Sequence, residues 1–104
     1  MSSFSVRVVL HNSNDYANVH ADMESVGFSR TITADSGVVY HLPNGEYIVQ
    51  DVDWTIHQIH SEVLAVVQQH SAAVSIFVTQ WADAGVRFSG LTPVRPQLRA
   101  LAWR

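Results

Sequence analysis

The amino-acid sequence predicts a mixed α+β fold of ferredoxin-like type, with two helices on one face of a four-stranded antiparallel sheet. Two observations support this class. Stretches of alternating apolar and polar residues and two stretches with helical periodicity follow one another in the order β-α-β-β-α-β, and the connections are short. Two split βαβ units of this order interleave into one sheet with both helices on one side. A chain of 104 residues is long enough to close one hydrophobic core.

A change of periodicity separates the first strand from the first helix. Residues 4–10 alternate, and their apolar side is formed by Phe4, Val6, Val8 and Leu10. A helix over residues 14–26 follows, because Ser13 or Asn14 is a suitable N-cap and Gly27 suits the position after the last turn.

Two glycine-containing turns interrupt the next extended stretches. The turn Asp35–Gly37 lies between residues 28–33 and residues 38–50, and a second turn signal, Pro43–Gly45, lies inside the latter. We predict a hairpin at the first signal and a bulge at the second, within one long third strand.

The second half of the chain predicts a helix over residues 55–69, a fourth strand near residues 74–78 and a short extra strand from Val86 to Ser89. The domain then covers residues 1–91, and residues 92–104 form a C-terminal tail with two prolines and three arginines. The predicted core consists of Phe4, Val6, Val8, Tyr16, Val19, Met23, Ile32, Ile56, Ile59, Val63, Val67, Val74 and Ile76.

The composition restricts the classes of function. There are no cysteines, which excludes disulfides, thiolate metal sites and cysteine nucleophiles and agrees with a cytoplasmic location. No apolar run approaches the roughly 20 residues of a membrane span, and the first residues do not have the pattern of a signal peptide, so no membrane association is expected. The net charge is −3, with six arginines and no lysine, so a nucleic acid would bind only through a local basic patch.

Several stretches together resemble one known family. They are Phe4–Val8, Asp15–Tyr16, Met23, Gly27–Ile32, Gly37–Pro43, Glu46–Tyr47 and Val78–Thr79. In this order and spacing the chain resembles the GhoS-like family of type V toxin–antitoxin antitoxins over roughly residues 4–91.

The resemblance implies a ferredoxin-like fold similar to that of small CRISPR-associated ribonuclease-like proteins. It also implies a cytoplasmic antitoxin that is itself an endoribonuclease and cleaves the single-stranded transcript of its toxin, with no DNA as partner. The CRISPR-associated relatives have an acidic metal ligand at the end of the first strand, where this chain has Leu10 and His11. We therefore expect cleavage without a metal ion and without a cofactor.

The expected catalytic residues are Arg30 and His11. RNA is cut without metal when a base removes the 2′-OH proton, an acid protonates the leaving oxygen and a cation stabilises the phosphorane. Histidine suits the first two roles and arginine the third. The alternatives are an edge-strand arginine for Arg30 and a hydrogen-bonding loop histidine for His11.

The expected RNA-binding residues are Arg7, Tyr40, His41 and Phe77. Alternation places Arg7 and Phe77 on the side of the sheet away from the helices, where RNA-binding sheets stack bases on aromatic rings. Tyr40 and His41 are adjacent, so only one of them faces a ligand. The alternative for this surface is a hydrophobic interface. A metal site at His57, three residues before His60 on the second helix, is not expected because no third ligand is near.

A second function class stays open, a non-catalytic module that binds RNA or a protein, and a third is a homodimerising accessory protein. A homodimer is expected in either case, because Val9 and Phe77 leave an apolar surface on the uncovered side of the sheet. The tail adds further apolar residues for a partner subunit, namely Leu98, Leu101 and Trp103, with Arg95 and Arg99 at the rim.

Overall fold

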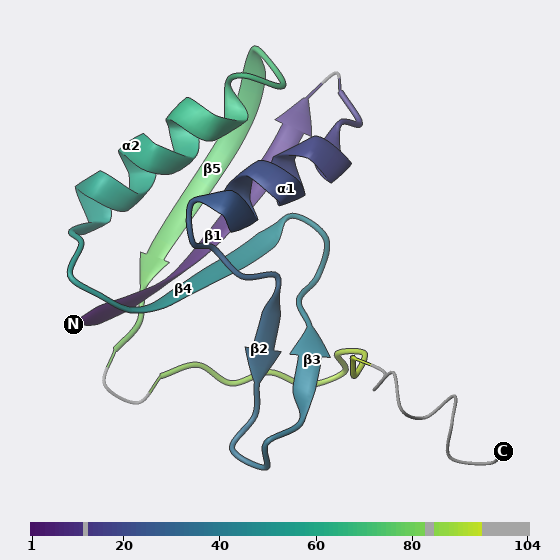
Figure 1. Ribbon diagram of the computed structural model, residues 1–104, viewed down its shortest axis with the longest axis vertical. Coiled ribbons are helices and arrows are strands. Elements are labelled where there is room, and N and C mark those ends of the chain that lie inside the picture. The colour runs from purple at the N-terminus through teal and green to yellow at the C-terminus, as the bar shows by residue number, and fades with distance from the viewer. Residues whose placement is uncertain (12, 83–84, 95–104) are drawn as a thin grey trace, which may run out of the picture.

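The computed structural model describes residues 1–11, 13–82 and 85–94 of the chain. Within them, the elements follow the order β1 (Ser2–His11), α1 (Tyr16–Ser25), β2 (Thr31–Thr33), β3 (Val39–His41), β4 (Glu46–Val52), α2 (Ile56–Val67) and β5 (Ala73–Gln80). The α+β class predicted from the sequence is confirmed. Figure 1 shows both helices on one side of the sheet.

Strand β1 is the centre of a three-stranded sheet with the order β4-β1-β5, and both of its neighbours are antiparallel to it. Its even-numbered residues from Phe4 to Leu10 face the helices and are buried, which confirms the predicted side for Phe4, Val6 and Val8. In this register Val6 lies opposite Tyr47 on β4 and Val78 on β5. The β1 alternation therefore decides which side chains reach the core and which lie on the other face.

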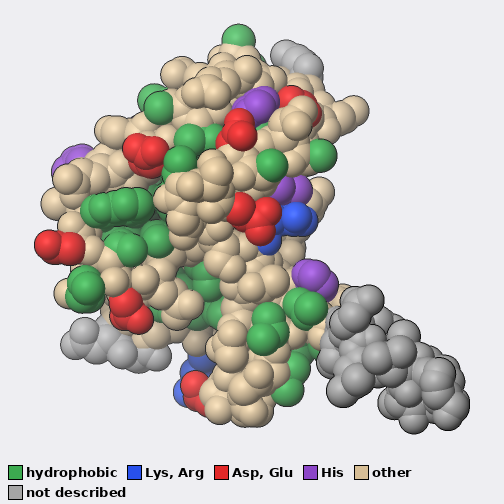
Figure 2. Space-filling view, in the orientation of Figure 1, with side chains coloured by type: hydrophobic (Ala, Val, Ile, Leu, Met, Phe, Trp, Pro, Cys, Tyr) green, Lys and Arg blue, Asp and Glu red, His purple; other side chains and the backbone are tan. Residues whose placement is uncertain are grey.

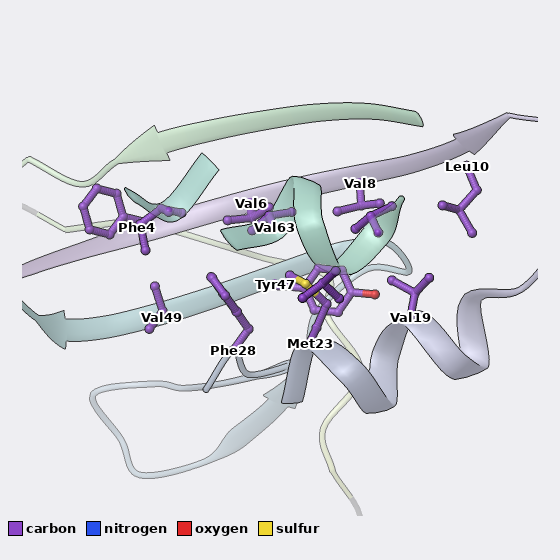
Figure 3. Close-up of a cluster of buried hydrophobic side chains, with 13 residues drawn as sticks. Phe4, Val6, Val8, Leu10, Val19, Met23, Phe28, Tyr47, Val49 and Val63 are labelled. Atoms are coloured by element: carbon purple, nitrogen blue, oxygen red, sulfur yellow. The ribbon is translucent and has the colours of Figure 1, made fainter. Parts of the chain in front are cut away.

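Helix α2 has the better-defined N-terminus of the two. Thr55 accepts a hydrogen bond from the Gln58 amide (3.1 Å), and the Gln58 side chain accepts one from the Thr55 amide (2.8 Å), which forms a capping box. Val63, at the centre of the helix, is fully buried as predicted. Both helices pack on a continuous core (Figure 3) whose members are Phe4, Val6, Val8, Leu10, Val19, Met23, Phe28, Tyr47, Val49, Ile59, Val63, Val66 and Val67.

The core prediction is wrong at Ile56, which is 37% exposed because it begins the first turn of α2. Tyr16, Val74 and Ile76 are partly buried and pack against the core. Val74 and Ile76 lie on β5, whose only partner strand among the described residues is β1.

The predicted hairpin at Asp35–Gly37 is confirmed, but its strands form a separate two-stranded sheet rather than part of a four-stranded one. Ahead of β2, the chain pairs with β4 at one residue, Ser29, which exchanges two backbone hydrogen bonds with Ile48 (2.7 and 2.9 Å). The Ser29 hydroxyl oxygen then accepts a hydrogen bond from the Thr31 amide (3.1 Å). From Arg30 on, the chain pairs with β3: the Arg30 carbonyl accepts a hydrogen bond from the Leu42 amide (2.8 Å), and β2 follows.

The predicted long third strand is wrong, because β3 and β4 are separate strands. The Glu46 amide donates to the Pro43 carbonyl (3.0 Å) and closes a turn between them. Gly45 has φ +86°, and a Cβ there would lie 2.7 Å from the Val8 carbonyl oxygen. The Gly45 carbonyl also accepts a hydrogen bond from the Val8 amide (2.8 Å), so the turn is held against β1.

The chain after β5 does not form the predicted strand at Val86–Ser89. Residues 85–92 are irregular and run across the hairpin (Figure 1). Pro93 then lies beside Tyr40, where the His41 amide donates to the Thr92 carbonyl (2.9 Å) and the Val94 amide donates to the Val39 carbonyl (2.8 Å). The start of the predicted tail thus pairs with β3, and the predictions for residues 95–104 lie outside the described residues.

None of the helices in the described part of the chain is both long and apolar enough to span a membrane.

Candidate functional site

The face of the β4-β1-β5 sheet away from the helices, called here the open face, presents the odd-numbered residues of β1. At its centre Arg7 lies opposite Phe77 on β5 and opposite Glu46 on β4. The Arg7 guanidinium forms an ion pair with the Glu46 carboxylate at 3.0 Å. The Phe77 side chain is 72% exposed, which is unusual for an aromatic residue in the middle of a strand. An exposed ring therefore lies beside a surface cation, as the alternation predicts.

His11 lies on the same face, at the end of β1. Its Nε2 is hydrogen-bonded to the Ser75 hydroxyl at 2.7 Å, and its backbone carbonyl accepts a hydrogen bond from Ser71 (3.2 Å). Arg7 and His11 are four residues apart on one strand, which separates them by about 13 Å along the open face. The side chain of His11 is exposed and is held in place by one neighbour.

The structure does not bring Arg30 to His11. Ser29 lies beside Ile48, which pairs with Ser5, and His11 lies six residues further along β1. The two ends are thus on the order of 20 Å apart. Arg30 instead lies close enough to His20 and Tyr47, below α1, for its charge to affect both. Figure 2 shows Arg, acidic and His side chains gathered on this helix-covered face. Arg30 and His11 therefore do not act on one phosphate in this structure.

The surroundings of Arg30 contain a buried polar cluster that was not predicted from the sequence. His20, 8% exposed, is hydrogen-bonded through Nδ1 to the Tyr47 hydroxyl and through Nε2 to the Asn44 side-chain oxygen (3.2 Å). Because an amide oxygen only accepts, Nε2 has the proton, and the Tyr47 hydroxyl donates to Nδ1. The hydroxyl lies between β4 and α1 in Figure 3.

The ionisation of this cluster follows from its burial. Burial lowers the pKa of His20 below 6.5, and the positive charge of Arg30 lowers it further. Burial also raises the pKa of Tyr47 to about 12, against the opposing effect of Arg30. Both groups are therefore neutral near pH 7 and join α1 to β4. His20 follows Tyr16 by four residues and precedes Met23 by three, and this spacing was the available signal.

Tyr40 and His41 lie on the hairpin and not on the open face. The Tyr40 ring contacts Phe88 edge to face, with centroids 5.4 Å apart, and His41 is exposed. Phe88 lies in the segment after β5, so the Tyr40 ring helps to hold that segment against the hairpin. The four predicted RNA-binding residues are thus divided between two places: Arg7 and Phe77 lie on the open face, and Tyr40 and His41 lie on the hairpin.

The described part of the chain does not bring together a set of ligands for a metal ion. No group of three His, Cys, Asp or Glu side chains among those residues is placed to hold a metal ion, and His57 and His60 are exposed on α2.

Neither a protein-family model nor a curated protein matches this chain.

Proposed function

We propose that this chain is a small RNA-acting protein that holds single-stranded RNA on the open face of its sheet. The observation that supports this function best is the pair formed by Arg7 and the exposed ring of Phe77. An arginine attracts backbone phosphates, and an aromatic ring on a sheet stacks with bases of any sequence. RNA is the proposed partner because single strands present their bases for stacking, whereas duplex DNA does not.

The fold proposed for this function is ferredoxin-like. The element order, the two helices on one face and the place of Ser29 at the outer edge of β4 all support it. In this proposal, the hairpin strand β2 is the fourth strand of the sheet and is bent out of it after Ser29.

The proposed activity is that of a cytoplasmic endoribonuclease antitoxin, and it rests on the resemblance to the GhoS-like family. In metal-independent cleavage a base removes the proton of a 2′-OH and O2′ bonds to phosphorus. The P–O5′ bond then breaks while an acid or a water molecule protonates O5′, which leaves a 2′,3′-cyclic phosphate and a 5′-OH. The proposed base is His11, because it lies on the proposed RNA face. Arg7, about 13 Å from His11 along β1, holds a neighbouring phosphate in this proposal, and Arg30 lies elsewhere.

The second candidate is a non-catalytic homodimeric module that binds RNA or a protein through the open face. The separation of Arg30 from His11 favours it, because it removes one member of the predicted catalytic pair. A second copy of the chain is the proposed protein partner, since Phe77 and the half-buried Val9 form an apolar surface there.

Binding of a labelled unstructured RNA, measured by fluorescence anisotropy, tests the proposal. Phe77→Ala should weaken binding about 5- to 100-fold, which is the usual worth of one base–aromatic stack. Val38→Ala, an exposed apolar residue on the hairpin, is the control and should bind as the wild type does. Absence of binding, or equal affinity for Phe77→Ala and the wild type, contradicts the proposal.

The same mixture, incubated with EDTA and followed by product analysis, separates the two candidates. Cleavage that persists with EDTA and is slowed strongly by His11→Ala supports the metal-free nuclease. Binding without cleavage under any condition supports the non-catalytic module, and light scattering of the purified protein shows whether that module is a dimer.

A further inference from the structure

Two adjoining cavities form one groove between the hairpin and the segment after β5. Their volumes are about 370 and 240 Å³, and both are lined by Ile32, Val86, Arg87 and Phe88. The larger lies toward the hairpin tip and the smaller toward the sheet. Together they have the size of an ordinary small-ligand site.

Local contacts hold the walls of the groove in place. Ile48 lines the smaller cavity from the open-face side of β4, and its burial comes from the segment that covers it. Phe88 is fixed by its contact with Tyr40. The Trp81 indole, which lines the larger cavity, donates a hydrogen bond to the Ser5 hydroxyl at 2.7 Å. Contacts with neighbouring residues therefore position the side chains that line the groove.

The smaller cavity connects the groove with the open face. Glu46, which accepts the ion pair from Arg7, also lines this cavity. Arg87 lines both cavities, is exposed, and has no ion pair with any residue that the structure describes. A strand of RNA lying over Arg7 thus meets a second cation when it continues into the groove.

The larger cavity differs from the smaller one in its polar groups. Asp35, at the hairpin turn, and Gln50, near the end of β4, both line it. A carboxylate repels a phosphate but accepts hydrogen bonds from amino and imino groups of a base. The groove thus has a group suited to each part of one nucleotide. Arg87, which lines both cavities, suits the phosphate, and the carboxylate and amide of the larger cavity suit the edge of a base. The aromatic side chains Trp81 and Phe88 also line it.

We propose that this groove is a base-binding subsite for single-stranded RNA, in which Arg87 contacts a backbone phosphate and Asp35 and Gln50 contact the edge of a base beside Trp81. The assignment rests on the proposed RNA-binding function and extends it to selectivity. The subsite prefers adenine and cytosine to uracil, because their exocyclic amino groups donate to the Asp35 carboxylate. The one donor on the uracil edge, N3–H, lies between two carbonyl oxygens that the carboxylate repels.

The test compares the affinities of labelled oligo(A), oligo(C) and oligo(U) for the full chain by fluorescence anisotropy. The wild type should bind oligo(A) and oligo(C) about tenfold more tightly than oligo(U). Asp35→Asn should remove this preference. Glu62→Gln, which removes an exposed carboxylate on α2, is the matched control and should keep it.

A second variant tests the phosphate contact. Arg87→Gln should weaken binding of all three oligonucleotides alike and reduce the slope of log K against log salt concentration by about 0.7, the value for one phosphate contact with a single strand. Circular dichroism of each variant shows whether its fold is intact, and both positions are exposed.

The outcomes separate this assignment from the function on which it rests. RNA binding that depends on Phe77 but is unchanged in Asp35→Asn and Arg87→Gln overturns the subsite and leaves the open-face proposal standing. Absence of RNA binding overturns both. A groove variant that turns a dimer into a monomer also overturns the subsite, because a second copy of the chain then occupies the groove.

Discussion

The Tyr47 hydroxyl donates a hydrogen bond to Nδ1 of His20, and this bond joins strand β4 to helix α1 inside the core. Tyr47 is fully buried, so its polar atom depends on this partner. The bond fixes the tautomer of His20 as well as the position of the helix.

Tyr47→Phe should destabilise the protein by about 1–3 kcal/mol, because it leaves Nδ1 of His20 buried without a donor. Chemical denaturation of the wild type and the variant measures the difference in the free energy of unfolding. Tyr40→Phe is the matched control: the Tyr40 hydroxyl has no hydrogen bond to the described residues, so a change within about 0.5 kcal/mol is expected. Equal losses for both variants would contradict the role given to the bond.

His70 makes the stability of the protein depend on pH. Its Nε2 donates to Asp22 (2.6 Å) and its Nδ1 to Asp15 (3.1 Å), and these hydrogen bonds raise the pKa of His70 above 6.5. A raised pKa in the folded state means that the stabilisation is complete below about pH 6.5 and is lost as the pH rises through the raised value.

The free energy lost in His70→Gln should therefore be larger at about pH 5.5 than at about pH 8.5. Denaturation curves of variant and wild type at the two pH values give this comparison. The opposite effect of His20 is common to both proteins and cancels. His57→Gln, an exposed histidine on α2, serves as the control. A difference that does not change with pH would show that His70 is not held by the two carboxylates.

Gly45→Ala should cost more than Gly37→Ala, although both positions have a positive φ. A Cβ at Gly45 would lie 2.7 Å from the Val8 carbonyl, whereas a Cβ at Gly37 meets nothing within 4 Å. Backbone strain alone is worth about 1 kcal/mol or more in each variant, and the clash with β1 adds to it only at Gly45. Melting temperatures of the two variants decide the order, and the reverse order would disprove the close approach.

Val63→Ala should destabilise the protein by about 1–3 kcal/mol, because Val63 is fully buried between α2 and the sheet. Val38→Ala removes the same atoms from an exposed position on the hairpin and should change stability little. The two denaturation midpoints are compared directly, and similar losses would show that α2 packs through another face.

Elements that are specified by the residue pattern within a short stretch of sequence could be predicted. The alternation of β1, the buried side of α2 and the hairpin at Asp35–Gly37 are of this kind, because periodicity and turn chemistry act over a few residues. The alternation also places Arg7 and Phe77 on one face, since both strands contribute their odd-numbered residues there.

What could not be predicted depends on contacts between distant segments. After Ser29 the chain changes its pairing partner from β4 to β3, and periodicity carries no information about such a change. The separation of Arg30 from His11 follows from the strand order and register, which place Ser29 beside Ile48 and His11 six residues beyond Ser5. Likewise, the residues expected to form a strand at Val86–Ser89 pair with no strand of the described chain, and the contact with β3 comes later, at Pro93.

The pairing of Pro93 with Tyr40 has a consequence for synthesis on the ribosome. The hairpin is made early, but the segment that pairs with it at Pro93 is translated roughly fifty residues later, a delay of roughly 3–10 s at ordinary elongation rates. Throughout that interval, the His41 amide and the Val39 carbonyl on one edge of the nascent hairpin lack the partners that residues 92–94 provide later. A chaperone that recognises unpaired strand edges has its opportunity there, before residue 94 leaves the exit tunnel.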